Sequence, residues 1–295
     1  MISSVITAMP TPFLHDKIDY SSLERLLDKQ IRAKVSAVVL FGSTGEGANI
    51  EYNEYEECVK LVANSLKDTD VKLFVGASST ATSRVIKLAE IAKRNNAFGV
   101  LVSPSPYNKP TQDGIFDIYK TLSQTSIPFI AYNIPGRTCV DISDEIIVKI
   151  SELPNFVGLK DSTGDIKRII ELKNKNSSLN LLCGDDYMFL ANMIHGTNGI
   201  ISVASNVIPR TMVKIYNLCE QNNYTEAVKV FNSIYPLFLS LFCQSNPIPI
   251  KFTLKHLGIF SSAELRSPLI ELGDKKLISI LLDNINNAQS IENSL

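Results

Sequence analysis

The sequence has few of the residues from which metal sites, disulfide frameworks and histidine-based catalytic triads are built. Among 295 residues there are five cysteines and three histidines, and no two cysteines form a Cys-x-x-Cys pair. Zinc sites and disulfide frameworks need cysteines in suitable spacings, and triads of the serine-protease type need a histidine. We therefore expect no metal site and no disulfide framework. The cysteine usage fits a reducing compartment such as the cytoplasm.

An excess of charge and long hydrophobic runs are also absent. The formal net charge is −1, with 45% hydrophobic and 20% charged residues. Nucleic-acid-binding domains usually carry a basic patch, and a membrane-spanning helix needs about 20 consecutive apolar residues. The N-terminal residues 1–7 lack the basic region of a secretory signal. We therefore expect a soluble globular protein that binds neither nucleic acid nor membranes.

Eight short apolar runs alternate with stretches of helical periodicity. Runs of this length between turn residues predict buried strands. Ser21 and Glu24 form a candidate capping box, Ser143 and Asp165 precede two further helical stretches, and Pro209 opens another. Eight strand–helix units predict an α/β fold, the (β/α)8 TIM barrel. The runs cover residues 4–9, 37–41, 72–75, 99–102, 129–132, 156–160, 179–183 and 199–203.

The end of the chain follows a different pattern. After about residue 218 no further strands are predicted, and helical stretches cover residues 226–239, 249–257 and 274–285. We therefore expect a barrel catalytic domain at 1–223 and a C-terminal helical domain at 224–295. A doubly wound open sheet is the alternative fold. It would need a glycine-rich turn after the first strand, where Pro10-Thr11-Pro12-Phe13 stands instead.

The sixth apolar run ends in Lys160, which is unusual for a buried strand. Burying a charged ammonium group is costly, and one solution is a neutral amine that acts as a nucleophile. The alternative is a lysine just past the strand, with its stem on apolar surface and its head in solvent. Taken alone, the rarity of buried lysine favours this alternative.

Other polar residues follow the predicted strands, where the active sites of barrel enzymes lie. Tyr132 ends the strand before that of Lys160, and a phenol beside an amine can relay protons. Arg137 lies on the next loop, and its planar guanidinium suits a carboxylate. The loop Gly42-Ser43-Thr44-Gly45 offers hydroxyl and N–H groups for a small anion.

Each of these residues also has a structural interpretation. Tyr132 could be an aromatic residue of the barrel rim, and Arg137 could form a surface ion pair. The loop 42–45 resembles a phosphate loop but lacks its lysine, and Asp185-Asp186 is better explained as a helix cap than as a metal site. Their positions at successive strand ends favour a joint site.

The motifs together resemble the dihydrodipicolinate synthase family, within the superfamily of pyruvate-dependent aldolases. The resemblance covers nearly the whole chain. It rests on Gly42-Ser43-Thr44-Gly45-Glu46, residues 104–110 with Tyr107-Asn108, Tyr132-Asn133-Ile134-Pro135-Gly136-Arg137-Thr138, Gly158-Leu159-Lys160-Asp161, Gly184-Asp185-Asp186, Gly199-Ile200-Ile201-Ser202-Val203 and Asn246-Pro247-Ile248-Pro249.

The resemblance implies a reaction and a set of roles. Lys160 would form a Schiff base with pyruvate, without a metal or organic cofactor, and the derived enamine would attack L-aspartate 4-semialdehyde in lysine and diaminopimelate biosynthesis. The roles are as follows: Tyr132, Ser43 and Tyr107 as a hydroxyl relay, Tyr107 coming from a neighbouring subunit; Thr44 for the pyruvate carboxylate; Arg137 for the aldehyde's carboxylate; and Gly184 and Ile201 as backbone lining. A homotetramer built as a dimer of dimers and a cytoplasmic location are also implied.

Other functions stay open beside this one. The Gly42-Ser43-Thr44 form, with serine first, also occurs in N-acetylneuraminate lyases, so an aldolase acting on neuraminate or on 2-keto-3-deoxy sugar acids is the alternative. The Arg137 loop and the Tyr107-Asn108 stretch favour the synthase. A non-catalytic barrel that only binds ligands is a third possibility, against which the intact Lys160 and Tyr132 argue. The residue type of Cys139, where glycine is common, has no explanation from the sequence.

The resemblance also bears on regulation. In many bacterial and plant relatives lysine binds at the subunit interface and inhibits, and the positions here that match that site are Gly47, Tyr52, Tyr55, Thr80, Arg84 and Pro106. The inhibited relatives have a glutamate at position 84 and an aromatic residue at position 106. Here these positions hold Arg84 and Pro106. An arginine would repel the ammonium group of lysine, and proline has no phenolic hydroxyl. We therefore expect weak or no inhibition by lysine.

Overall fold

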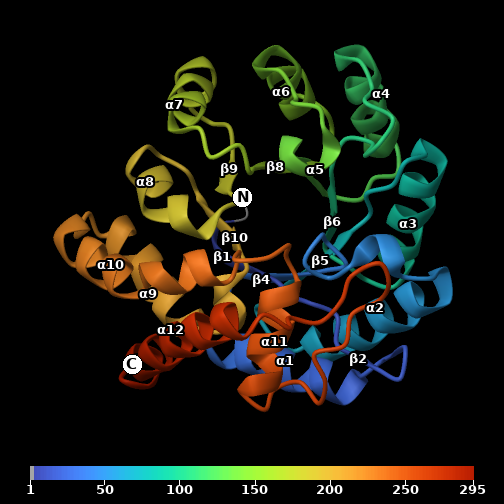
Figure 1. Cartoon of the computed structure of the whole chain (residues 1–295). Coiled ribbons are helices and arrows are strands. Elements are labelled where there is room, and N and C mark those ends of the chain that lie inside the picture. Colours follow the sequence, from blue (N-terminus) through green and yellow to red (C-terminus); the bar gives the residue numbers. More distant parts are fainter. Residues whose placement is uncertain (1–2) are drawn as a thin grey trace.

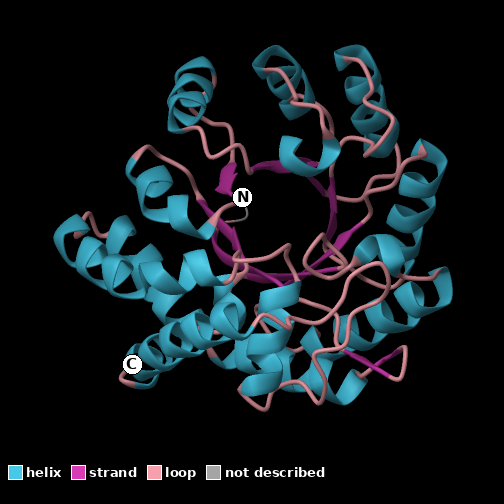
Figure 2. Cartoon of the chain, in the orientation of Figure 1, coloured by secondary structure: helices cyan, strands magenta, loops and turns pink. Residues whose placement is uncertain are grey.

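Eight parallel strands form a closed barrel in the order β1-β10-β9-β8-β7-β6-β5-β4 (Figure 2). The structure is a computed structural model that describes residues 3–295. Met1 and Ile2, part of the N-terminal stretch considered above, lie outside the described residues. The closed ring of parallel strands confirms the predicted barrel. The strands are β1 (Ser4–Ala8), β4 (Ala37–Leu40), β5 (Lys72–Gly76), β6 (Gly99–Val102), β7 (Phe129–Asn133), β8 (Phe156–Asp161), β9 (Leu181–Cys183) and β10 (Gly199–Ser202).

Helices surround the barrel on its outside (Figure 1). Parallel neighbours need a crossover, and the helices supply it. The connections also hold a small hairpin, β2 (Phe13–Leu14) with β3 (Lys17–Ile18), and the short helices η1 (Gly47–Asn49), α5 (Pro135–Thr138), η2 (Asp186–Met188) and η3 (Ala204–Asn206). The main helices are α1 (Tyr20–Arg32), α2 (Tyr52–Leu66), α3 (Thr82–Arg94), α4 (Gln112–Ser123), α6 (Asp144–Ser151), α7 (Ile166–Lys175), α8 (Phe189–Ile194) and α9 (Pro209–Glu220).

The strand side chains divide between two hydrophobic clusters. Because successive residues of a strand point to opposite faces, one set packs under the helices and the other fills the barrel. Tyr132 belongs to the inner set, and Lys160 is in register with Tyr132 on one side and Leu182 on the other. The lysine therefore points into the barrel. The inner cluster consists of Ile6, Ala8, Ala37, Val39, Phe74, Leu101, Ile130, Tyr132, Leu182 and Ile201.

Most of the predicted helix starts agree with the structure. Ser143 and Asp165 accept N-terminal backbone hydrogen bonds, and Pro209 is the first residue of α9. The predicted capping box at Ser21 is wrong, because α1 begins earlier, at Tyr20. Asp19 caps it by accepting from the Ser22 N–H, and a carboxylate is as good a cap as serine.

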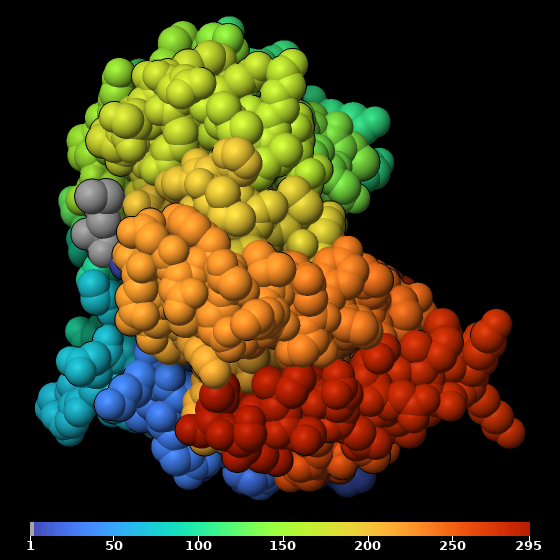
Figure 3. Space-filling view, turned by 90° about the vertical axis from the view of Figure 1, so that its left-hand side faces the viewer, coloured from blue at the N-terminus to red at the C-terminus, as the bar shows by residue number. Residues whose placement is uncertain are grey.

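Three helices follow the barrel, at α10 (Tyr224–Ser240), α11 (Ile248–His256) and α12 (Lys275–Asn293). Helices α10 and α12 lie side by side on one flank of the barrel, as the orange and red surfaces of Figure 3 show. Helix α11 lies closer to the strand ends (Figure 1). Of the helices in residues 3–295, none combines the length and the apolar character that crossing a bilayer requires.

Candidate active site

A cavity of about 350 Å³ lies at the C-terminal ends of the strands. Lys160 and Tyr132 line it, together with Ser43 and Thr44 from the loop after β4 and Arg137 from α5. The structure thus brings together the residues predicted from separate strand ends. The cavity lining is completed by Ile134, Gly136, Ser162, Gly184, Asp185, Val203, Phe242, Gln244, Ser245 and Asn246.

Lys160 is buried, with 5% of its surface exposed. Its Nζ lies 4.2 Å from the centre of the Tyr132 ring, and the ion pairs of residues 3–295 do not include it. Strand β8 continues to Asp161, so Lys160 lies one residue inside the strand and not at its end. This burial excludes the alternative in which the ammonium head lies in solvent.

A polar network fixes the two strand ends beside the cavity. The Asn133 side chain donates to Asp161 at 3.0 Å and to Asp141 at 2.7 Å. Arg168 donates to Asp141 at 2.7 Å and lies 3.5 Å from Asp161. Because Asn133 and Asp161 directly follow Tyr132 and Lys160, this network holds the phenol and the amine in register.

The two predicted anion-binding residues are joined by Asn246. The side-chain amide of Asn246 donates to Thr44 Oγ1 at 2.9 Å, and the backbone carbonyl oxygen of Asn246 accepts from Arg137 Nη2 at 2.7 Å. Arg137 is exposed and forms no ion pair among the described residues. A guanidinium group has five N–H donors, so donors remain for a carboxylate in the cavity.

Gly184 lines the cavity as predicted, and its lack of a side chain is required there. A Cβ atom at this position would lie 1.9 Å from Ser162 Oγ and 2.6 Å from the Asp161 carbonyl oxygen. Ile201 is fully buried in the inner cluster and is not among the lining residues, whereas Val203 is. The residue that lines the cavity here is therefore Val203, just after β10 and two residues beyond the predicted Ile201.

Tyr107 does not join the cavity of its own chain. Its side chain is 89% exposed, and its backbone has a φ of 70°. Cys139, also on the surface, has a φ of 57° at the C-terminus of α5. Glycine adopts this left-handed conformation most readily, so Cys139 stands where the backbone favours glycine.

The acidic pair after β9 plays two different parts, and neither side chain makes a capping hydrogen bond to η2 or α8, the helices that follow it directly. Asp186 instead accepts from the N–H groups of Val203 and Ala204, at the start of η3, and from Ser202 Oγ. Asp185 faces the cavity, and burial raises the pKa of its carboxyl to about 6, partly offset by the charge of Lys160. Within residues 3–295, no three acidic, histidine or cysteine side chains are placed to hold a metal ion.

Sequence reasoning missed several cavity residues. Ser162 directly follows strand β8, so its position could have indicated it, whereas Asp185, two residues after β9, was considered only as a helix cap. Phe242, Gln244, Ser245 and Asn246 come from the segment between α10 and α11, and no strand-end rule points to that segment.

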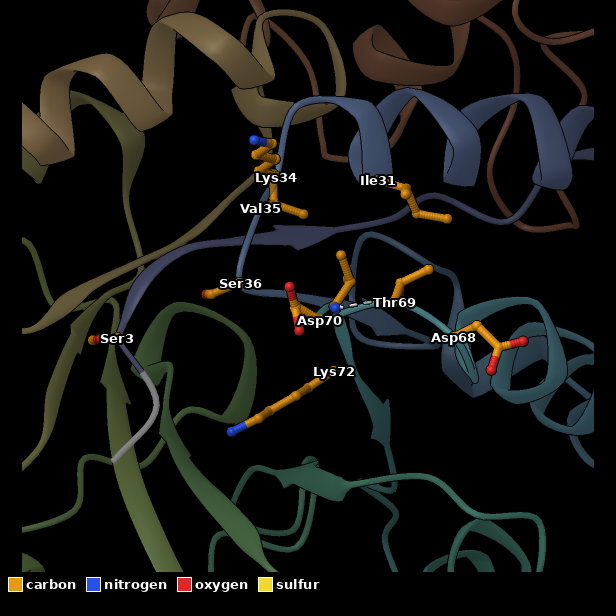
Figure 4. Close-up of a pocket in the computed structure, with 10 residues that line it drawn as sticks. Ser3, Ile31, Lys34, Val35, Ser36, Asp68, Thr69, Asp70 and Lys72 are labelled. Atoms are coloured by element: carbon orange, nitrogen blue, oxygen red, sulfur yellow. Dashed lines mark hydrogen bonds between the residues drawn. The ribbon is translucent and has the colours of Figure 1, made fainter.

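Two further cavities differ from this one in place or lining. A cavity of about 310 Å³ adjoins it, shares Ser43, Tyr132 and Arg137, and extends to Pro106 and Leu269. Another, of about 630 Å³, lies at the N-terminal ends of β1, β4 and β5, with the side chains of Asp70 and Lys72 beside it (Figure 4). Because barrel chemistry takes place at the C-terminal ends, we assign the active site to the first cavity.

Comparison with known proteins agrees with this geometry. Residues 1–281 match the sequence model of the Dihydrodipicolinate synthetase family. The 4-hydroxy-tetrahydrodipicolinate synthase of Campylobacter curvus is 36% identical over 273 residues, 92% of each chain. The structure of the enzyme of that name from Methylacidiphilum fumariolicum has a TM-score of 0.94 at 32% identity and covers 98% of this chain and 97% of its own.

A second solved structure is that of the dihydrodipicolinate synthase from Acinetobacter baumannii in complex with pyruvate. It has a TM-score of 0.94 at 32% identity and covers 98% of this chain and 99% of its own. The likeness therefore extends over the whole barrel and the helices that follow it. The chain belongs to the dihydrodipicolinate synthetase family.

Proposed function

We propose that the protein condenses pyruvate with L-aspartate 4-semialdehyde through a Schiff base on Lys160, giving 4-hydroxy-tetrahydrodipicolinate for lysine and diaminopimelate biosynthesis. It is thus a lyase of the Schiff-base aldolase type. The observation that carries this proposal is the buried Lys160 amine, without an acidic partner, against the Tyr132 ring in a cavity that also holds Thr44 and Arg137. Such an amine is available to a keto acid, whereas an ion-paired one is not.

The chemistry uses the cavity residues in sequence. The Lys160 nitrogen adds to the keto carbon of pyruvate, and water leaves to give the imine. The protonated imine draws electrons from the methyl group, which loses a proton and becomes an enamine. The enamine carbon then attacks the aldehyde, whose oxygen takes up a proton and becomes the hydroxyl group. The amino group of the same substrate adds to the imine carbon, which closes the ring and expels the Lys160 amine, and Tyr132 with Ser43 carries the protons. The Thr44 loop holds the pyruvate carboxylate and Arg137 that of the aldehyde substrate.

Trapping and selectivity together test the proposal. We expect sodium borohydride to fix one pyruvyl group per chain, and peptide mapping to place it on Lys160, with no adduct in Lys160→Met. Product formation with L-aspartate 4-semialdehyde, but not with N-acetylmannosamine or glyceraldehyde, separates the synthase from the sugar-acid aldolases. Absence of any reducible adduct would refute the proposal and leave the non-catalytic barrel.

Assembly and organisation are part of the same proposal. The protein acts in the cytoplasm as a homotetramer built as a dimer of dimers, with residues 1–223 as the barrel domain and 224–295 as the helical domain. Tyr107 completes the relay in a neighbouring subunit, which accounts for its 89% exposure in the single chain. Sedimentation should give a tetramer, and a Tyr107→Phe variant should lose activity while Lys160 is still trapped.

A further inference from the structure

A second buried lysine, Lys251, lies on α11 and does not face the active-site cavity. Its side chain has no exposed surface, and its Nζ donates to Glu46 Oε1 at 2.6 Å. The Glu46 side chain is 1% exposed, and its other oxygen accepts from the Arg266 backbone N–H at 3.0 Å. The pair therefore links the C-terminal helices to the loop after β4, with both side chains buried.

The loop that carries Glu46 is the one that carries Ser43 and Thr44. It is tightly closed: Gly47 N–H donates to the Gly42 carbonyl at 3.1 Å, and a Cβ atom on Gly47 would lie 1.9 Å from the Phe41 carbonyl oxygen. Glu46 itself has a φ of 52°, a left-handed conformation that is unfavourable for a residue with a side chain. Such a conformation persists only where the surroundings hold it.

The same C-terminal segment contacts this loop at a second point. Asn246, just before α11, donates to Thr44 Oγ1 at 2.9 Å and accepts from Arg137. The segment 246–251 thus holds the loop from both sides of Gly45, at Thr44 and at Glu46. A shift of α11 would move Thr44 in the cavity.

Energetics favour a positioning role for the pair. Replacing a buried ion pair by apolar residues of similar volume is often neutral or stabilising, so stability alone does not account for such a pair. What an ion pair provides and an apolar contact lacks is a fixed direction and distance between its two elements. Here those elements are α11 and the loop that binds the keto acid.

We propose that Lys251 and Glu46 are positioning residues, which hold the Ser43–Thr44 loop in the geometry that binds the carboxylate of the keto-acid substrate. This inference rests on the proposed function and deepens it. The Asn246 bridge sets the side chain of Thr44, and the Lys251–Glu46 pair sets the backbone of the loop that carries it. Neither Lys251 nor Glu46 touches the substrate.

The test compares two variants with the wild type by thermal unfolding and by steady-state kinetics. Lys251→Met leaves the Glu46 carboxylate buried without its partner, and the double variant Glu46→Gln with Lys251→Met removes both charges. We expect the melting temperature to fall in the single variant and to return towards the wild-type value in the double variant. The KM for pyruvate should rise about tenfold in both variants, because neither keeps the ion pair that fixes the position of the Ser43–Thr44 loop.

A purely structural pair would give a different pattern. If the double variant recovers both the melting temperature and the KM for pyruvate, or if KM is unchanged in both variants, the positioning role is refuted. Should Lys251→Met fail to fold, the double variant decides alone. Lys229→Met, which breaks the exposed pair with Glu226, is the matched control and should change neither quantity. Borohydride trapping on the wild type reports separately on the proposed function.

Discussion

The surroundings of Lys160 and Lys251 differ in one respect that decides their chemistry. Both side chains are nearly or fully buried, and both amines lie over an aromatic ring, at 4.2 Å from the centre of Tyr132 and 4.1 Å from that of Phe13. Only Lys251 has a carboxylate partner, Glu46 at 2.6 Å. Burial alone therefore does not make a lysine a nucleophile.

The space around each lysine completes the contrast. Lys160 borders an open cavity with hydroxyl groups and an arginine on its walls, whereas Lys251 is enclosed by protein. Burial lowers the pKa of Lys251 to about 8, and the neighbouring Glu46 opposes this shift. Lys160 thus has access to a substrate and forms no ion pair within the described residues, whereas Lys251 has an ion-pair partner and no access.

The largest expected effect comes from removing the accessible amine. Lys160→Met should lower kcat/KM for the condensation by about 10⁴-fold or more, because no other group can form the imine. Its free energy of unfolding in urea should change little, since Lys160 forms no ion pair within residues 3–295 and only its longer-range attraction to Asp185 is lost. A strongly destabilised Lys160→Met would mean that this lysine, too, has a structural role.

Removing the Lys251 amine should have the opposite consequence, a large loss of stability. Lys251→Met leaves Glu46 buried without a cation, which should cost about 3 to 5 kcal/mol in the free energy of unfolding. The control Lys229→Met, on an exposed pair, should cost no more than about 0.5 kcal/mol. Urea unfolding of both variants measures the difference. Equal losses in the two would show that the Lys251–Glu46 pair has no special weight.

Asp185 is an acidic residue near Lys160, and the pH dependence of stability that it causes gives a further test of how the two lysine environments differ. Its pKa rises from 3.8 to about 6 on folding, so the folded state binds more protons than the unfolded one between these values, and stability falls as pH rises through them. At pH 7.5 Asp185→Asn should therefore be more stable than the wild type by about 2 to 3 kcal/mol.

The same variant provides its own control near pH 4. There the carboxyl is almost fully protonated in the folded state and partly protonated in the unfolded state, so the gain should shrink to about 0.5 kcal/mol. Urea unfolding at the two pH values gives both numbers. A gain that does not depend on pH would show that the Asp185 carboxyl is not the group that titrates.

How much of the structure could be predicted from the sequence depends on how far apart along the chain the contacting residues lie. Lys160 and Tyr132 lie in the last two residues of their strands, and Thr44 follows a strand. Strand order alone places such residues at one end of a barrel, so their meeting was predictable. Asn246, just before α11, and Lys251, within it, reach the same end from about 200 positions beyond Thr44 and Glu46. No periodicity or spacing encodes that packing, and the sequence offered only a proline-rich turn at this point.

Local competition explains the smaller errors. At α1, Asp19 and Ser21 are both good caps, and the sequence does not say which one the chain uses. Asp186 comes shortly after strand β9 and begins η2, a position at which an acidic residue often caps its own helix. The Asp186 carboxylate instead accepts hydrogen bonds from the N–H groups of Val203 and Ala204, at the start of η3 after the neighbouring strand β10.

The smallest expected effect is that of free lysine on activity. It follows from a third place where cations lie over an aromatic ring, beside those of Lys160 and Lys251. The Arg84 guanidinium and the Lys87 ammonium both lie over the ring of Tyr52, at 5.0 Å and 3.9 Å from its centre. Here the aromatic face already holds two cations, so another ammonium meets like charge and an occupied ring. Millimolar lysine should therefore inhibit the coupled assay by less than about twofold.

Reversing one charge at this ring tests the reason as well as the outcome. Arg84→Glu removes a cation from Tyr52 and adds a carboxylate, so the variant should be inhibited by lysine more strongly than the wild type. Lys93→Glu, on the same helix but away from Tyr52, makes the same change in net charge and should leave the response as it was. Strong inhibition of the wild type at sub-millimolar lysine would contradict this account, because it would require an ammonium site that Arg84 does not block.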